Sequence, residues 1–309
     1  MKINKGKPKI RKLGTGDCDM VETTPLVING RLFRFEYVRD NYRPNKTGKS
    51  YFRFKDIETN AVTAPFAVGY HFGSAYNDNG TVYVFGVPKI GGEIMTVFRS
   101  KDLANWEQKD IFNLPGWRLF NNSVCESPDG FTMAFEIGAP AEECGHPFTI
   151  RFAKSADLWN WALTPSGCVY SKDRYTACPY IRYLPQDGFY YMVYLEAMPG
   201  WGYVPYIARS KDLVDWHRSP VNPVMMFDEN EDKKLGHHFF TIEERERIAG
   251  ALDINNSDFD MCEFLGRTII NYSWGNQTGL EFLAEAVYEG SAAEFLQGFF
   301  EEWEGGVPG

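Results

Sequence analysis

The segment Ser100-Lys-Asp-Leu-Ala-Asn-Trp106 recurs twice more in this chain of 309 residues. The later copies are Ser155-Ala-Asp-Leu-Trp-Asn-Trp161 and Ser210-Lys-Asp-Leu-Val-Asp-Trp216, so the spacing is 55 residues both times. Each copy follows a short apolar strand pattern, and Ser and Asp at these positions favour a tight turn. Repetition at such a period is typical of architectures built from similar units placed side by side.

Five hairpin signals accompany the repeat, each with a Gly at the turn between two apolar strands. They lie at residues 26–33, 75–84, 124–133, 180–191 and 259–270. A third and a fourth strand extend each hairpin into one four-stranded unit. The sequence therefore predicts an all-β fold, a five-bladed β-propeller, in which the Leu and Trp of each repeat fill the gap between neighbouring blades.

We expect one propeller domain over residues 1–309. Its parts are an N-terminal arm at 1–16 and blades at roughly 17–66, 67–113, 114–168, 169–235 and 236–290. Thr241-Ile-Glu-Glu244 has the pattern of a capping box, which predicts a short helix before the last blade. The tail from Ala292 to Trp303 has helical spacing and is expected to pack outside the propeller.

Composition narrows the classes of partner. The net charge of −9 argues against nucleic acid, because phosphate binding requires clustered Lys and Arg. No apolar run approaches the roughly 18 residues of a membrane-spanning helix, and the first residues lack the apolar region of an export signal. The 6 Cys residues are scattered without a Cys-x-x-Cys pair. We therefore expect reduced thiols, a cytoplasmic location, and neither a nucleic-acid nor a membrane partner.

The repeated Ser-x-Asp-Leu turn and the strand–Gly–strand hairpins resemble the five-bladed glycosidase superfamily. This superfamily includes the arabinanases and β-xylosidases of glycoside hydrolase family 43 and the invertase and levansucrase enzymes. The resemblance covers roughly residues 17–290. It implies a glycoside hydrolase that cleaves a glycosidic bond in an oligosaccharide or polysaccharide-derived substrate, with paired carboxylates at the central channel.

The resemblance also implies where those carboxylates lie. The family carries a base or nucleophile in the first blade, often an Asp before Pro, a pKa-tuning acid in the second and an acidic Glu in the third. This sequence departs from that pattern, since it has Thr24 before Pro25, His71-Phe-Gly-Ser74 without an acid, and Asn121-Asn-Ser123. The site residues of the family therefore do not transfer to these positions.

Strand alternation suggests replacements, because residues two apart share one face. Counting back from each hairpin Gly places Glu22, Asn122 and Asp258 at the same offset, with Asp260 two residues further on. We expect these four residues to form a ring around the channel mouth. Asp258 or Glu22 is then the candidate base or nucleophile.

A second ring is predicted from the strand that follows each hairpin Gly. Glu36 and Glu136 come six residues after their Gly, and Glu196 comes eight residues after, which keeps the same parity. Glu136 or Glu196 is the candidate general acid, and Glu36 a candidate substrate ligand. The alternative is structural, with these carboxylates pairing with nearby arginines.

Further substrate contacts are expected from His71 and from three Trp residues near loop glycines, namely Trp117, Trp201 and Trp274. No metal or cofactor is expected, although Asp258 and Asp260 with Glu263 resemble an oxygen-ligand cluster that would suit calcium. Two other functions compete with hydrolysis, a catalytically inactive glycan-binding propeller and a scaffold for protein partners. Two carboxyls converging in an open pocket favour the enzyme.

Overall fold

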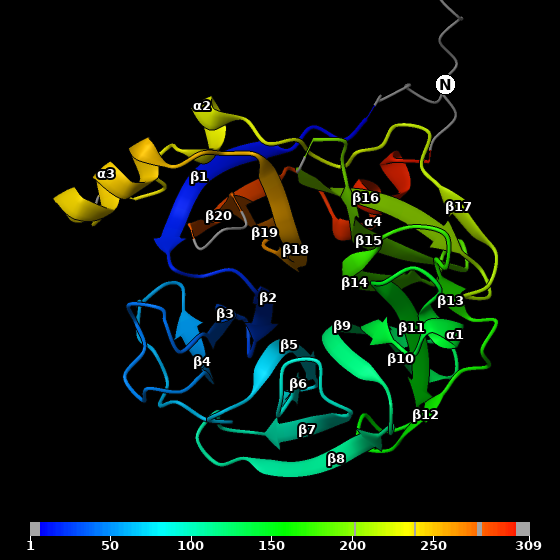
Figure 1. Cartoon of the computed structure of the whole chain (residues 1–309). Helices are drawn as coiled ribbons and strands as arrows, with labels where there is room; N and C mark the ends of the chain where they lie inside the picture. The colour runs from blue at the N-terminus through cyan, green and yellow to red at the C-terminus, as the bar shows by residue number, and fades with distance from the viewer. Residues whose placement is uncertain (1–6, 201, 238, 277–279, 301–309) are drawn as a thin grey trace, which may run out of the picture.

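A computed structural model describes residues 7–200, 202–237, 239–276 and 280–300. Within these ranges five antiparallel sheets are arranged radially around one axis (Figure 1). Five inner strands contact one another in a ring: β2 (Thr23–Ile28), β5 (His71–Asp78), β9 (Arg118–Ser127), β14 (Ala177–Leu184) and β18 (Asn255–Phe264). The predicted five-bladed β-propeller is confirmed.

Each blade continues outward from its inner strand by antiparallel pairing. The first adds β3 (Arg31–Val38) and β4 (Tyr51–Asp56), and the second adds β6 (Thr81–Val87), β7 (Ile94–Ser100) and β8 (Glu107–Asn113). The third adds β10 (Gly130–Ala139), β11 (Thr149–Ser155), β12 (Trp161–Leu163) and the short β13 (Val169–Tyr170). The fourth adds β15 (Phe189–Ala197), β16 (Tyr203–Ser210) and β17 (Trp216–Arg218), and the fifth adds β19 (Arg267–Gly275) and β20 (Glu281–Tyr288).

Two blades depart from the expected four strands. The first has three, and its outer edge is covered by segment 61–66, which makes only the single bridges Phe52–Phe66 and Lys55–Val62. The third has five, because β13 also pairs with β11. Residues 169–170, expected at the start of the fourth blade, therefore belong to the third sheet.

The fifth blade is completed by the other end of the protein. Strand β1 (Arg11–Cys18) pairs antiparallel with β20, from Arg11 opposite Val287 to Cys18 opposite Phe282. The expectation of a solvated arm over residues 1–16 is therefore wrong for this segment. Pairing satisfies the backbone donors and acceptors at the edge of β20, and Thr15 becomes fully buried.

The three repeat turns occupy equivalent places, between β7 and β8, between β11 and β12, and between β16 and β17. In the first, Asp102 Oδ1 accepts the backbone N–H groups of Ala104 and Asn105 at 2.9 and 2.8 Å, and Ser100 Oγ accepts that of Leu103 at 3.0 Å. The same bonds recur at Asp157 and Asp212. The same side-chain to backbone hydrogen bonds thus form the turn before the outer strand in three of the blades.

The Trp of each repeat packs on the blade that precedes its own. Trp106 stacks on Phe66 with ring centroids 3.9 Å apart, and Trp216 stacks on Phe152 at 5.5 Å. Trp161 meets Phe85 edge-on at 5.6 Å. All three rings are partly buried. The prediction that they fill gaps between blades is confirmed, and the hydrophobic cores lie between adjacent sheets.

Four short helices decorate the sheets: α1 (Ala141–Cys144), α2 (Glu229–Asp232), α3 (Ile242–Gly250) and α4 (Ala292–Gly298). Helix α3 begins with the predicted capping box, in which Thr241 and Glu244 exchange hydrogen bonds. Helix α4 has its own capping box at Ser291 and packs through Phe295 and Leu296 into the core between the fourth and fifth blades. Both predicted helices are confirmed, but α4 inserts apolar side chains between two blades instead of packing outside the propeller. Residues 301–303 of the expected tail lie outside the described residues.

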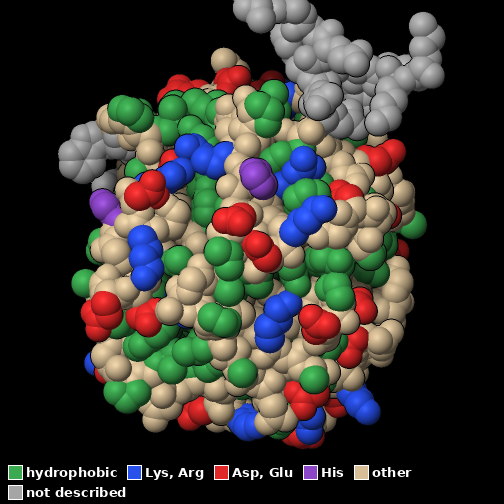
Figure 2. Space-filling view, turned by 90° about the vertical axis from the view of Figure 1, so that its right-hand side faces the viewer, with side chains coloured by type: hydrophobic (Ala, Val, Ile, Leu, Met, Phe, Trp, Pro, Cys, Tyr) green, Lys and Arg blue, Asp and Glu red, His purple; other side chains and the backbone are tan. Residues whose placement is uncertain are grey.

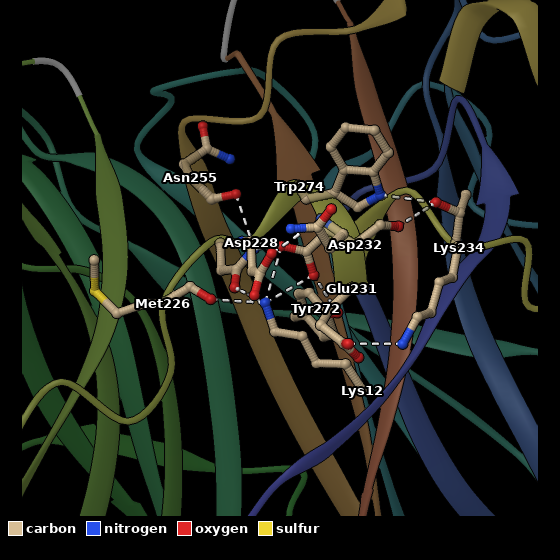
Figure 3. A network of polar contacts seen from close by, with 12 residues as sticks. Lys12, Met226, Asp228, Glu231, Asp232, Lys234, Asn255, Tyr272 and Trp274 are labelled. Carbon is tan, nitrogen blue, oxygen red and sulfur yellow. Dashed lines mark hydrogen bonds and ion pairs between the residues drawn. The ribbon is translucent and has the colours of Figure 1, made fainter. Parts of the chain in front are cut away.

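A buried polar network fastens β1 and α2 to the fifth blade (Figure 3). Lys12 Nζ donates to Asp232 Oδ2 at 2.9 Å, to Asn256 Oδ1 at 2.8 Å and to the Met226 carbonyl at 2.7 Å. Tyr272 donates its hydroxyl to Asp232 Oδ1 at 2.6 Å. Because Asp232 is fully buried, the network specifies this arrangement of the strand, the helix and the blade.

The surface carries no single dominant charge on the side that lies to the right in Figure 1. Figure 2 shows acidic, basic and apolar side chains interspersed there. Among the described residues, no helix combines the length and apolar character needed to cross a bilayer.

Candidate active site

The inner strands begin at one end of the channel, and three of them begin with a bulge. Their pairing shifts register between His71 and Ser74, between Ala177 and Tyr180, and between Ser257 and Asp260. Inside these bulges Phe72, Cys178 and Asp258 have φ values of 51°, 46° and 50°. A bulge changes the direction of side chains that would otherwise alternate strictly between the two faces of a strand. The side chains that face this end of the channel are therefore not those that alternation alone would place there.

A pocket lies at this point on the axis. Its lining comes from all five blades and includes the four residues expected to form a ring: Glu22, Asn122, Asp258 and Asp260. The remaining lining is mostly small or polar: Thr23, Thr24, Gly73, Ser74, Asn121, Cys178, Pro179 and Phe259. All four lie together at the pocket, but Asn122 pairs opposite Phe135 as Thr24 pairs opposite Phe35, so the register equivalent of Asn122 in the first blade is Thr24 and not Glu22.

Asp258 is held by two hydroxyl groups. Its Oδ2 atom accepts from Ser257 Oγ at 2.7 Å and from Ser273 Oγ at 3.1 Å. The Cys178 thiol lies close by, since burial and then the charges of Asp258 and Glu136 raise its pKa far above the ordinary value. Asp258 therefore sits on the axis with a fixed orientation.

Glu136 lies directly behind two lining residues, Asn121 and Cys178, on the third-blade side of the pocket. Its Oε2 atom accepts from the Cys178 backbone N–H and from Asn121 Nδ2, both at 3.0 Å. Burial raises the pKa of Glu136 to about 7, the two donors oppose this, and the charges of Asp258 and Glu22 add to it. A buried carboxyl of this kind carries a proton at and below neutral pH.

Glu22 lines the pocket from the first blade, with a cation beside it. Its Oε1 atom accepts from Arg39 Nη2 at 2.6 Å, and Arg39 Nη1 lies 3.5 Å from Glu281 Oε2. Burial raises the pKa of Glu22, Arg39 opposes this effect, and Asp258 adds to it. The other oxygen, Oε2, is buried without a hydrogen-bond partner among the described residues. A buried acceptor without a partner is unusual and marks this carboxyl as a candidate functional group.

One carboxyl of the expected second ring is an internal ion pair. Glu36 is fully buried and accepts from Arg34 and Arg53, both at 2.6 Å. Burial alone would raise its pKa, but the two arginines hold it below the ordinary value. Glu36 is therefore a structural ion-pair residue, as the alternative interpretation held.

Glu196 pairs with Arg218 of the outer strand β17 at 2.8 Å. The register explains why it does not join the cluster. In the fourth blade, Tyr194 occupies the position that Glu136 occupies in the third. Each residue lies on the second strand of its blade, where the pairing with the inner strand shifts register. Glu196 lies two residues after Tyr194 on the same strand. The expectation that it faces the central pocket is therefore wrong.

The predicted aromatic contacts have three different outcomes. Trp274 is fully buried, stacks on Phe282 and donates to Thr15 Oγ1 at 3.0 Å, so it is a core residue and not a sugar platform. Trp117 is partly exposed and lines a cavity of about 470 Å³ formed by loops of the second and third blades. Trp201 lies outside the described residues. His71 is partly exposed and shares a hydrogen bond of 2.7 Å with Tyr37.

The idea of a calcium site finds no support in the geometry. Glu263 accepts from the Ala292 backbone N–H at the start of α4, far along β18 from Asp258. Within the part of the chain that the structure describes, His, Cys, Asp and Glu form no group of three able to hold a metal ion.

Sequence reasoning missed Glu281 and Cys178. Burial raises the pKa of Glu281 to about 7, with Arg39 opposing and Glu22 and Asp258 adding. Glu281 begins β20, a strand outside the hairpins from which offsets can be counted. Cys178 enters the pocket through a bulge at a non-glycine residue, which leaves no signal in the sequence.

Neither a known sequence family nor a curated protein sequence matches this chain. Solved structures do match it. The catalytic domain of an α-L-arabinofuranosidase from Coprinopsis cinerea is 9% identical, with a TM-score of 0.63 over 93% of this chain and 98% of that one. The α-L-arabinofuranosidase PaAbf62A from Podospora anserina, in complex with cellotriose, is 10% identical, with a TM-score of 0.61 over 93% and 98%.

A xylan β-1,4-xylosidase from Bacillus halodurans is 13% identical, with a TM-score of 0.57 over 89% of this chain and 54% of the xylosidase. At these identities the likeness concerns the fold. The chain shares the five-bladed propeller of glycoside hydrolases.

Proposed function

We propose that this protein is a glycoside hydrolase that acts on an oligosaccharide or polysaccharide-derived substrate at the central pocket. The observation that carries the proposal is that Glu136 accepts from the Cys178 backbone N–H at 3.0 Å, while Cys178 and Asp258 both line the pocket on the propeller axis. Burial raises the pKa of Glu136 to about 7. Hydrolysis of a glycoside requires one protonated and one ionised carboxyl beside the scissile bond. The fold shared with arabinofuranosidases and xylosidases supports this class of reaction.

In this proposal Glu136 is the general acid. Its proton passes to the glycosidic oxygen as the bond from that oxygen to the anomeric carbon breaks. Asp258 either takes a proton from an attacking water or attacks the anomeric carbon itself, and the anomeric configuration of the product separates these two routes. Glu22 and Arg39 bind hydroxyl groups of the sugar that is cleaved.

The substrate class follows from the same comparison. Arabinose- or xylose-containing plant glycans are the substrates to test first, because the neighbours are named for arabinofuranosidase and xylosidase activity. No cofactor enters the proposal.

The experiment is hydrolysis by the wild type and by Glu136→Gln and Asp258→Asn variants. Glu136→Gln should lower turnover by about two to four orders of magnitude on natural glycosides and much less on substrates with good leaving groups. Asp258→Asn should lower turnover on both kinds of substrate, because attack at the anomeric carbon is required in every case. Glu196→Gln serves as a matched control and should retain activity. Wild-type turnover in both pocket variants would contradict the proposal.

A second candidate is a glycan-binding propeller without turnover. It is favoured by Thr24 and Ser74, which line the pocket where the resemblance would place two acids. Saturable glycan binding by the wild type, with no product released from any glycoside of the panel, would establish this alternative.

A further inference from the structure

We propose that an aromatic arc on the second, third and fourth blades binds the leaving-group sugars of an extended substrate. The aromatic arc consists of Phe72, Phe120, Phe148, Tyr175 and Tyr203. The inference rests on the proposed function and adds to it a binding site, its ligand and the direction in which the substrate lies.

The arc is continuous from blade to blade. Phe72 and Phe120 have ring centroids 5.6 Å apart, Phe120 and Phe148 are 4.9 Å apart, and Phe148 and Tyr175 are 5.7 Å apart. Tyr175 and Tyr203 continue the series at 5.4 Å. Four such steps form a path longer than a single sugar ring.

Interior packing accounts for one of these rings, Phe72, which packs against the cores on both sides of the second blade, but not for the other four. Phe120, Phe148, Tyr175 and Tyr203 belong to none of the hydrophobic cores that the described residues form between blades. All members except Phe120 are partly exposed. A row of partly exposed rings crossing three blades is typical of a binding surface, and apolar sugar faces stack on such rings.

The arc joins the central pocket on the side of Glu136. Phe148 directly precedes β11, in which Ile150 pairs with Glu136, and the Phe148 carbonyl accepts from the Thr176 backbone N–H at 2.9 Å. Tyr175 directly precedes Thr176 and lies three residues before Cys178, which lines the pocket; burial, followed by the charges of Cys178 and Glu136, raises the pKa of its hydroxyl.

The position of the acid fixes which sugars the arc holds. Glu136 must reach the glycosidic oxygen, so the leaving group lies on its side of the pocket, over the third and fourth blades. Glu22, Arg39 and Glu281 lie on the other side, on the first and fifth blades. The sugar that carries the anomeric carbon therefore lies beside the first and fifth blades. The sugars of the leaving group extend along the arc.

Binding is tested in the Glu136→Gln background by electrophoresis through native gels that contain arabinoxylan, arabinan or pectin. Phe148→Ala and Tyr203→Ala should each weaken binding about fivefold to tenfold, the usual scale for losing one stacked ring. Phe148→Tyr and Tyr203→Phe keep the stacking surface and should retain binding. Trp159→Ala, a partly exposed ring in the turn between β11 and β12, is the matched control and should bind normally.

Turnover gives a second readout in the otherwise wild-type protein. The two Ala variants should lower kcat/KM on an oligosaccharide about tenfold more than on a glycosyl fluoride, because a fluoride leaving group cannot reach the arc. An equal loss on both substrates, or gel migration unaffected by either Ala variant, would overturn the inference. Full turnover by Glu136→Gln would contradict the proposed acid, whereas the gels report on the arc alone.

Discussion

Glu36 and Glu136 show how two equivalent residues acquire opposite properties. Each lies at the same place in the second strand of its blade. Glu36 accepts from two arginines and stays ionised, whereas Glu136 accepts from an amide and a backbone N–H, and burial raises its pKa to about 7. Position alone therefore does not make a general acid, and the neighbouring side chains decide.

The raised pKa of Glu136 predicts the alkaline limb of the pH profile. The acid must be protonated, so kcat/KM on a natural glycoside should fall about tenfold per pH unit above pH 7. A glycosyl fluoride needs no protonation and should lack this limb. A profile on the natural glycoside that stays flat up to pH 9 would exclude Glu136 as the acid.

Arg39 is expected to stabilise the folded protein through Glu22. Arg39→Ala leaves a buried carboxylate without its cation, which should cost about 1–3 kcal/mol of unfolding free energy. Adding Glu22→Gln removes the stranded charge and should restore part of the loss. Urea denaturation of both single variants and the double variant gives the coupling energy, and purely additive effects would contradict the pairing.

At the scale of elements, each of the three repeat turns is stabilised by the carboxylate of its own Asp. Asp157 accepts two backbone N–H groups and the Asn160 side-chain amide. Asp157→Ala should lower the unfolding free energy by about 1–2 kcal/mol. The exposed hairpin residue Asp129 is the matched control, and Asp129→Ala should change stability by less than about 0.5 kcal/mol in the same urea titration.

The sequence predicts the hairpins, turns and both helices because each carries a local signal. It also brings the four ring residues to one pocket, although the offset counted for Asn122 differs from its register, which matches that of Asp260. It fails where tertiary contacts decide. Gly275 indicates a loop after Trp274, and β19 does end at Gly275, but Trp274 itself is a buried strand residue. A side chain at Gly275 would collide with the Leu280 carbonyl oxygen, so this Gly also allows β19 and β20 to approach closely.

For the whole molecule, buried carboxyl groups set the pH of greatest stability. Burial raises the pKa of Glu136, Asp260 and Glu281 to about 7 each. Burial and the neighbouring Asp232 also raise the pKa of Asp253. Between the ordinary values near 4 and these raised values the folded state binds more protons than the unfolded state, so stability falls as the pH rises.

Melting temperatures across pH 4.5–8.5 test this expectation. The melting temperature should be highest near the acidic end and should decline as the pH passes 7. Asp253→Asn removes one of the buried charges and should raise the melting temperature above pH 8 by about 2–4 °C relative to the wild type. A melting temperature that increases steadily from pH 5 to 8 would show that these groups do not control stability.

The pairing of β1 with β20 has a consequence for the order in which the protein can be assembled during synthesis. Residues 11–18 leave the ribosome long before their partner residues 282–287. Four blades can form from local hairpins while translation continues, but the fifth must wait for β20. Until then the edge of β1 that faces β20 stays unpaired, although Asp232 of α2, the partner of Lys12, is synthesised earlier. Completion of the ring is therefore the final, long-range step, and a nascent polypeptide halted before residue 281 remains an open arc with exposed strand edges.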